Sequence, residues 1–277
     1  MRITFIGHVC VDRNVIRGET EVFYGGGVIH GSVTAKRLGA YPIVLTKCAD
    51  DDRANFTSFQ EAGIEVRFLS SQSSTSIRNV YPSENPDERQ SFLISRAAPF
   101  SVEDFDGIEA DVAHLNPLWF GEFPPALLPQ LKRRVNLLAG DAQGFLRRAG
   151  DNGTMVYRDL ESKRDVLSVF DVFKVDSKEA HILTGHVDVR QAARAVQELG
   201  PKTVILTHRG GVCVFDGEEY YESPFTGFTI EGRTGRGDTC TAAFLVAMHR
   251  MGLRDATALA AEVTSRKMQH RGPYRGF

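Results

Sequence analysis

The sequence predicts an α/β fold in which helices cover both faces of a central, mainly parallel sheet. Short apolar runs alternate with helical patterns along most of the 277 residues, as in chains built from strand–helix units. With 42% hydrophobic and 25% charged residues, the chain can also bury a substantial core. Two glycine-rich segments, 24–32 and 232–239, lie near opposite ends of the chain. We therefore expect one domain over residues 1–277 with one composite site.

The first expected strand, 3–6, is a short apolar run that ends at a glycine. The elements expected after it are strand 42–47, helix 55–62, strand 66–69, strand 112–116, helix 125–134, strand 135–140, strand 172–175, helix 189–199, strand 203–206 and strand 212–215. In such sheets the ligands bind outside the carboxyl ends of the strands. Functional side chains are therefore expected at the ends of these strands.

Two segments, 11–24 and 75–94, interrupt the strand–helix alternation. Both alternate polar and apolar residues and carry few helix signals. In the second segment, 75–81 and 88–94 flank a turn region at 82–87, which predicts a hairpin.

Charge and cysteine content exclude several functional classes. A net charge of -2 provides no basic surface for nucleic acid. The four cysteines lack Cys-x-x-Cys spacing, which argues against a zinc site or a disulfide framework and favours a reducing compartment. We find neither a signal peptide nor an apolar run long enough to span a membrane, so a cytoplasmic protein with no membrane partner is expected.

The segment 232–239, followed by a small and apolar run at 240–248, predicts a glycine-rich turn that opens a helix. Gly235 and Gly237 allow successive N–H groups to converge on an anion at the positive end of the helix dipole. Asp238 lies within this turn, where a carboxylate can take a proton from an attacking hydroxyl. The alternative is that Asp238 only caps the helix. A cradle with a base beside it indicates phosphoryl transfer to an alcohol.

Four segments, in order, resemble the PfkB carbohydrate kinases, the ribokinase-like sugar and nucleoside kinases. The family's Asp-Thr-Thr-Gly-Ala-Gly-Asp signature is matched at 232–238, with departures at Gly232, Arg233 and Arg236. The glycines at 25–27 match its N-terminal signature, where His30 replaces the usual Asn. Residues 174–185 are similar to the family's Asn-x-x-Glu segment, and 203–212 to its nucleotide-facing strand and turn. The resemblance implies a ribokinase-like fold in which 11–24 and 75–94 form a small β-sheet lid.

The resemblance also assigns the catalytic groups and the donor site. Asp238 would be the general base, and the N–H groups of Gly235, Arg236 and Gly237 would hold the phosphoryl oxygens. The Arg236 guanidinium would reach the phosphate or a substrate oxygen, unless it lies in solvent. ATP with Mg²⁺ is the expected donor; the residues assigned to it are Asp176, Thr207, Arg209 and Gly211, with Glu179 acting on the metal through water. Asp176 and Glu179 could alternatively form a helix capping box, and both roles could hold at once.

The acceptor is expected to be a polyol. Substrate contacts are assigned to Asp12, Gly26, Gly27, Arg78, Asp87, Asn116 and Asp141. Arg78 and Asp87 could equally form a surface ion pair. Because the departures from the signatures look like the subgroup of myo-inositol kinases, a cyclitol is expected, most similar to the substrate of a myo-inositol 3-kinase. The alternatives are a kinase for another sugar or a keto-sugar acid, a nucleoside kinase, and a non-catalytic sensor. A monomer and a homodimer are both compatible with the resemblance.

Overall fold

The computed structural model describes residues 1–81, 89–227 and 232–277. The predicted turn at 82–87, including Asp87, lies outside the described residues.

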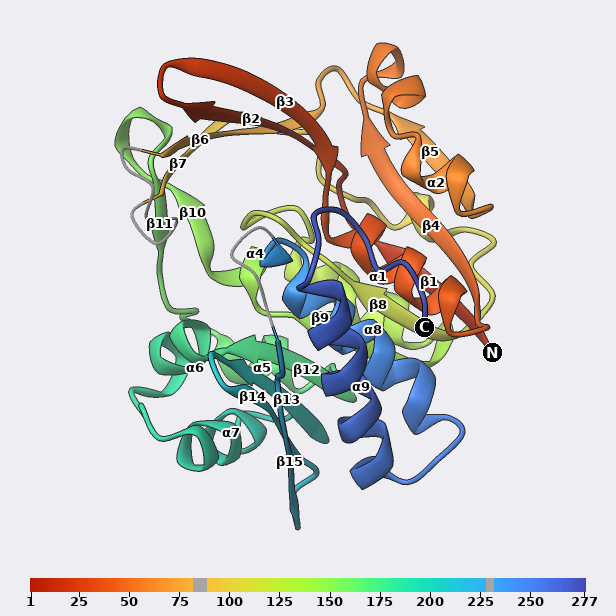
Figure 1. Ribbon diagram of the computed structural model, residues 1–277, viewed down its shortest axis with the longest axis vertical. Helices are drawn as coiled ribbons and strands as arrows, with labels where there is room; N and C mark the ends of the chain where they lie inside the picture. The colour runs from red at the N-terminus through yellow and green to blue at the C-terminus, as the bar shows by residue number, and fades with distance from the viewer. Residues whose placement is uncertain (82–88, 228–231) are drawn as a thin grey trace.

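A nine-stranded sheet runs through the centre of the molecule (Figure 1). From one edge to the other its strands are β15 (Tyr220–Pro224), β14 (Gly211–Phe215), β13 (Thr203–His208), β12 (Val172–Asp176), β9 (Val135–Asp141), β8 (Ala110–Leu115), β1 (Arg2–Ile6), β4 (Tyr41–Cys48) and β5 (Glu65–Ser70). The strands from β13 to β5 pair in parallel, while β14 and β15 add an antiparallel edge. The predicted mainly parallel sheet is therefore confirmed.

Helices cover both faces of this sheet and form two cores. One core contains apolar side chains of α1 (Gly27–Arg37), α2 (Ser58–Glu61), α8 (Arg236–Met248) and α9 (Leu253–Lys267). The other contains those of α3 (Leu128–Lys132), α4 (Gln143–Leu146), α5 (Lys163–Leu167), α6 (Ser177–Thr184) and α7 (Val189–Gln197). Successive residues of a strand point to opposite faces, so Phe5 joins the first core and Ile6 the second. Among the described residues, no helix is both long and apolar enough to span a membrane.

The two segments that interrupt the alternation form a separate four-stranded sheet. Its order is β3 (Glu19–Gly25), β2 (Cys10–Ile16), β6 (Thr75–Tyr81) and β7 (Gln90–Ser95). Strands β6 and β7 pair antiparallel, which confirms the predicted hairpin apart from its turn. In Figure 1 this sheet arches away from the main body, beside the short pair β10 (Arg147–Ala149) and β11 (Met155–Tyr157).

Two predicted helices are shorter than expected. The helix predicted at 55–62 is reduced to the single turn of α2, which ends before Gly63, and a 3-10 turn, Asp50–Asn55, precedes it. The helix predicted at 125–134 begins as a 3-10 turn, Pro125–Leu127, before α3. Proline lacks the N–H that an α-helix interior needs, so Pro125 and Pro129 are accommodated only at the starts of these turns.

Candidate active site

Polar side chains that were predicted to be functional, and that are far apart in the sequence, lie together at the carboxyl ends of four adjacent parallel strands. Asn116 follows β8, Asp141 ends β9, Asp176 ends β12, and Thr207 lies one residue before the end of β13. These strands are consecutive neighbours in the sheet. The structure therefore brings these residues to one edge, as the strand-end rule predicts.

The glycine-rich turn at the start of α8 is shaped by close neighbours on both sides. Gly235 is the N-cap residue with φ 80°, and a Cβ there would lie 2.3 Å from the ring of His30. A Cβ on Gly237 would lie 2.9 Å from Cε and Nζ of Lys174. Glycine is thus required at both positions. The Arg236 N–H donates to Arg233 O at 3.2 Å, whereas the N–H groups of Gly235 and Gly237 have no partner within the helix and are available to an anion.

Asp238 lies inside the first turn of α8, because Gly235 is the N-cap residue and no side chain caps the helix. The alternative that Asp238 serves as the helix cap is therefore wrong. A Cβ on Gly27 would lie 2.4 Å from Asp238 Oδ1, and Asn116 Nδ2 donates a hydrogen bond to the same oxygen at 3.3 Å. Gly27 and Asn116 thus border the carboxylate directly.

The charge of Asp238 is controlled by its surroundings. Burial and the nearby Asp141 carboxylate raise the pKa of Asp238 to about 6, while Lys174 and the Asn116 hydrogen bond oppose the shift. A carboxyl with a pKa near neutral pH is suited to accept a proton from an alcohol.

Lys174 is a central residue that the sequence analysis did not select. It lies in β12 with 5% of its surface exposed, and its Nζ is 3.1 Å from Asp141 Oδ2 and 3.4 Å from Glu179 Oε2. Burial alone would lower the pKa of Lys174, but the carboxylates around it, Asp141 first, outweigh burial and raise it. The ammonium group is therefore a permanent positive charge beside Gly237. The sequence feature that could have identified Lys174 is a charged residue inside the otherwise apolar strand 172–175.

Asp176 and Glu179 form the capping box of α6, so the alternative for this pair is confirmed. The Glu179 N–H donates to Asp176 Oδ1 at 2.8 Å, and the Asp176 N–H donates to Glu179 Oε2 at 2.7 Å. Burial raises the pKa of Glu179 to about 8, although Lys174 opposes the shift. Since Glu179 Oε2 is already shared by Lys174 and the Asp176 N–H, this carboxylate fits an indirect role better than direct ligation of a metal.

The remaining residues predicted for the donor separate into two groups. Arg236 is half-buried at the cradle, 6.0 Å from the Phe225 ring, and burial lowers its pKa. Thr207 Oγ1 is buried without a hydrogen-bond partner in the described chain. Arg209, by contrast, is exposed, and a Cβ on Gly211 would lie 2.3 Å from Ser223 O. Gly211 therefore serves the close pairing of β14 with β15.

Asp12 lies on β2 beside the glycine-rich segment 24–32. Its Oδ2 would be 3.3 Å from a Cβ on Gly25, and the Cys10 thiol donates to Asp12 Oδ1 at 3.4 Å. Burial raises the pKa of Asp12, with Arg89 and Arg147 opposing the shift. Gly26 has φ 123°, and a Cβ there would lie 3.0 Å from His8 O, so the chain turns tightly into α1.

Arg78 does not join Asp12. It pairs in register with Arg13 on the opposite face of the four-stranded sheet, where it is exposed and stacks 5.1 Å from the Phe92 ring. Because side chains alternate along a strand, a substrate contact for Arg78 on the Asp12 face is wrong for this arrangement.

The Asp12 face instead carries an amide and hydroxyl network that sequence reasoning missed. Asn79 Nδ2 donates to Asn14 Oδ1 at 3.0 Å, and Ser91 Oγ donates to Asn79 Oδ1 at 2.6 Å. Asn79 and Ser91 are both buried, which is unusual for residues of an outlying sheet. In the sequence, Asn79 and Ser91 alternate with apolar neighbours. This alternation indicates which face of the sheet they share but not their hydrogen-bond partners.

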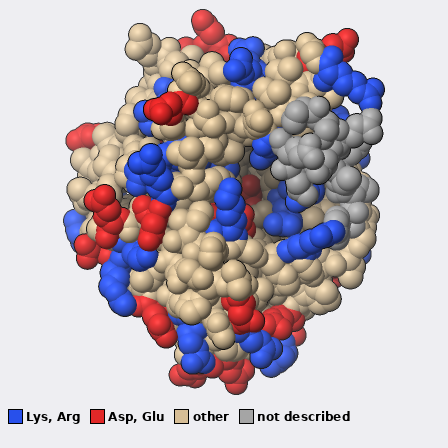
Figure 2. All heavy atoms as spheres, turned by 90° about the vertical axis from the view of Figure 1, so that its left-hand side faces the viewer, with Lys and Arg blue, Asp and Glu red and all other residues tan. Residues whose placement is uncertain are grey.

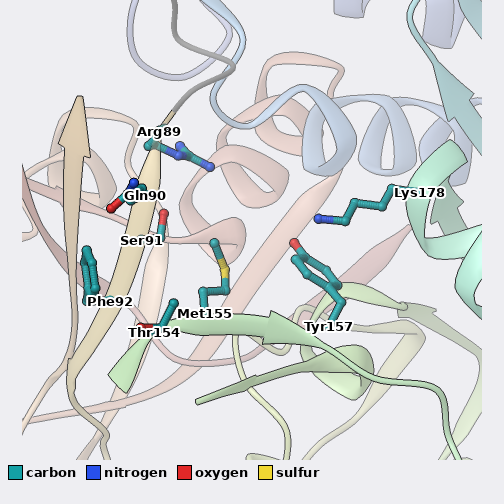
Figure 3. A pocket seen from close by; sticks show the side chains of 8 residues that line it. All are labelled: Arg89, Gln90, Ser91, Phe92, Thr154, Met155, Tyr157 and Lys178. Carbon is teal, nitrogen blue, oxygen red and sulfur yellow. The ribbon is translucent and has the colours of Figure 1, made fainter. Parts of the chain in front are cut away.

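A cavity of about 510 Å³ lies between β7, β11 and α6 (Figure 3). Ser91 and Tyr157 line it, and Arg89 and Lys178 point toward one another across it. Figure 2 shows a hollow on this side of the molecule, with basic side chains around it and acidic ones deeper inside. A basic rim over a partly acidic floor suits a ligand that combines phosphate groups with hydroxyls. Within the described residues no three His, Cys, Asp or Glu side chains cluster as metal ligands.

Comparison with known proteins agrees with this geometry. The model of the pfkB family of carbohydrate kinases matches residues 3–276. The structure of a pyrophosphate-dependent kinase in the ribokinase family, complexed with a pyrophosphate analog and myo-inositol, is 49% identical. The similarity covers 99% of this chain and 97% of that chain, with a TM-score of 0.93.

Two further relatives differ in the acceptor named for them. One solved structure concerns a pyrophosphate-dependent myo-inositol-1 kinase converted into a myo-inositol-3 kinase by replacing an asparagine and a serine with leucine. It is 48% identical, covers 99% of this chain and 95% of that chain, and has a TM-score of 0.91. A cytidine kinase of Thermococcus kodakarensis is 25% identical over 265 residues, covering 90% of this chain and 88% of that protein. The chain has the ribokinase-like fold and belongs to the pfkB family of carbohydrate kinases.

Proposed function

We propose that this protein phosphorylates myo-inositol and takes the phosphoryl group from pyrophosphate. The observation that carries the proposal is the Asp238 carboxylate, bordered by Asn116 and Gly27 at the N-terminus of α8 and close to Lys174. A base, an anion cradle and a fixed cation are the parts that phosphoryl transfer to an alcohol needs. The close similarity to pyrophosphate-dependent inositol kinases supports the choice of both substrates.

The acceptor side favours a neutral, hydroxyl-rich ring. Asp12, Asn14, Asn79 and Ser91 share one face of the four-stranded sheet and offer both donors and acceptors. Arg78, expected to pair with a substrate carboxylate, lies on the other face, although Arg89 and Arg147 are near enough to Asp12 to interact with its charge. The choice of a cyclitol over a sugar acid therefore rests on the similarity to inositol kinases. We propose that this sheet closes over the bound ring as a lid and excludes water, which would otherwise compete for the phosphoryl group.

The donor side favours pyrophosphate in place of the ATP expected from the sequence. Lys174, Lys178 and Arg236 lie on or beside the elements that meet the cradle, and each can pair with phosphate oxygens. Of the residues predicted to bind ATP, Arg209 is exposed and Gly211 is packed against β15. A small, highly charged donor needs only the cationic side chains.

In the proposed reaction Asp238 accepts the proton of one inositol hydroxyl. The hydroxyl oxygen forms a bond to the nearer phosphorus of pyrophosphate, the bridging P–O bond breaks, and inorganic phosphate leaves. The N–H groups of Gly235 and Gly237 hold the transferring group, with the Arg236 N–H, which also donates to Arg233 O, beside them. Lys174 balances the charge of that group. Mg²⁺ would supply positive charge that neutralises the donor, and Asp176 and Glu179 would hold it indirectly, through water.

We further propose that the product is the 1-phosphate, whereas the sequence resembles 3-kinases. In the related 1-kinase, exchange of one asparagine and one serine for leucine gives a 3-kinase. This chain has a hydrogen-bonded asparagine and serine, Asn79 and Ser91, on the substrate side of the four-stranded sheet. Polar groups here would hold ring hydroxyls that leucines would reject, so the ring would bind in a different orientation.

The experiment that tests the proposal measures phosphoryl transfer with Mg²⁺ from pyrophosphate or from ATP to a panel of acceptors. The panel contains myo-inositol, other cyclitols, ribose, fructose, a keto-sugar acid and cytidine, with Asp238→Asn as the inactive control. Product analysis by ³¹P and ¹H NMR identifies the phosphorylated carbon. Turnover of myo-inositol with pyrophosphate, lost in Asp238→Asn, is expected. Activity only with ATP refutes the donor, and activity only with cytidine or a sugar acid refutes the acceptor.

A further inference from the structure

A buried lysine of α9 holds the loop that precedes the anion cradle. Lys267 is the last residue of α9 and is fully buried. Its ammonium group donates to the carbonyl oxygen of Gly232 at 2.6 Å and also to the carbonyl oxygen of Thr234. The two hydrogen bonds therefore end on backbone carbonyls three residues and one residue before the N-cap Gly235.

The packing around this loop leaves it little freedom. A Cβ on Gly232 would lie 2.0 Å from Met268 O, so the loop contacts the end of α9 directly. On the other side, the buried ring of His30 lies against Gly235, where a Cβ would be 2.3 Å away. Burial lowers the pKa of His30 to about 3, and the positive charge of Lys267 adds to the effect. A neutral ring and a cation thus enclose the loop.

The hydrogen bond to Thr234 determines where the next N–H points. In a planar trans peptide the C=O of one residue and the N–H of the following residue point in opposite directions. When Lys267 draws the Thr234 carbonyl toward α9, the Gly235 N–H is turned away from α9. The cation also polarises that peptide group, which strengthens its N–H as a donor.

Burying an ammonium group has a high cost in free energy, so a buried lysine beside the cradle indicates that its charge has a role there. Burial lowers the pKa of Lys267 to about 8, and the Asp238 carboxylate opposes the shift. The charge of Lys267 is therefore felt at the catalytic base as well as at the loop.

We propose that Lys267 is a positioning residue for phosphoryl transfer: its ammonium group fixes the peptide planes of the 232–235 loop and so aims the Gly235 N–H at the transferring group. The inference rests on the proposed role of residues 235–237 as the anion hole. It does not depend on which alcohol is the acceptor.

The test compares Lys267→Met, Lys267→Ala and Lys267→Arg with a matched control, Arg266→Met. Arg266 precedes Lys267 on α9 but is exposed and pairs with Glu262. For the Met and Ala variants we expect kcat to fall roughly 10- to 100-fold, less than the 10²–10³ that loss of an anion-hole donor costs. The KM of the acceptor should change by less than about twofold, because the acceptor site is untouched. Methylammonium added to the Ala variant, or the Arg side chain, should restore kcat, which a purely structural role would not allow.

The second readout is pyrophosphate binding, measured without any acceptor as the increase in the melting temperature of the protein. Weaker stabilisation by pyrophosphate in Lys267→Met than in Arg266→Met supports the inference even if myo-inositol proves to be the wrong acceptor. The inference fails if Lys267→Met keeps the kcat and pyrophosphate response of the control, if neither methylammonium nor arginine restores activity, or if neither the Met nor the Arg variant folds. Absence of myo-inositol turnover in the wild-type protein contradicts the proposed function alone, and the series is then run with the acceptor that is turned over.

Discussion

The pH dependence of turnover tests the proposed role of Asp238 most directly. Burial and the Asp141 carboxylate raise the pKa of Asp238 to about 6, and only the ionised form can take a proton. Activity is therefore present above this value and is lost as the pH falls through it. At pH 5 a group of this pKa is about 9% ionised, so kcat/KM should be roughly a tenth of its plateau. A carboxyl at the ordinary value of 3.8 would be about 94% ionised, with almost full activity.

The phosphate groups of the donor also titrate near neutral pH. The variant Asp141→Asn is therefore used to distinguish the titration of Asp238 from that of the donor. Removal of the like charge should shift the acid limb of kcat/KM to lower pH, while Lys174 keeps Glu179 as a partner. The assay follows release of phosphate from pyrophosphate between pH 4.5 and 8. Circular dichroism at each pH confirms that the enzyme is folded, and Asp106→Asn, a surface carboxylate paired with Arg134, is the control. The reasoning is refuted if wild-type activity at pH 5 stays near its plateau, or if Asp141→Asn and Asp106→Asn give the same profile.

Three further predictions address the base, its neighbour and the core. Asp238→Asn should lower kcat on the order of 10²–10⁴ with little change in substrate binding by calorimetry, and near-normal kcat would disprove its role as base. Gly27→Ala places a methyl group 2.4 Å from Asp238 Oδ1, so kcat should fall more than about tenfold, whereas Gly252→Ala, with no neighbour within 4 Å, should be unaffected. Phe100→Ala removes a buried ring stacked 4.7 Å from Phe123 and should cost about 3–5 kcal/mol in urea unfolding without loss of kcat in the folded enzyme. A cost below about 1 kcal/mol would contradict the packing argument.

The buried strands and the signature turn were predictable from local sequence. Apart from Lys174 and Thr203, the runs 172–175 and 203–206 are apolar because helices cover both faces of a parallel sheet, and the pattern therefore survives in a single sequence. The helix of Gly235 and Asp238 was likewise marked by glycines that the backbone requires. The true extents of the helices predicted at 55–62 and 125–134 and the pairing of β10 with β11 were not predicted, because single-turn helices and three-residue strands leave too little periodicity.

The sequence by itself determined the fold class, the strand-end position of Asn116 and Asp141, and the place of Asp238 in a glycine-rich turn that opens a helix, since each follows from local pattern or a short motif. Only the tertiary structure decided which face of a strand reaches the site, so that Asn79 and Ser91 replaced Arg78 as candidates for contact with the substrate. It also decided the burial and the partners of Lys174 and Lys267, since those partners lie on other elements. The physical reason is that charge, burial and hydrogen bonding are properties of neighbours in space, and a lysine in a strand or at a helix end has no distinguishing local signal until those neighbours are in place.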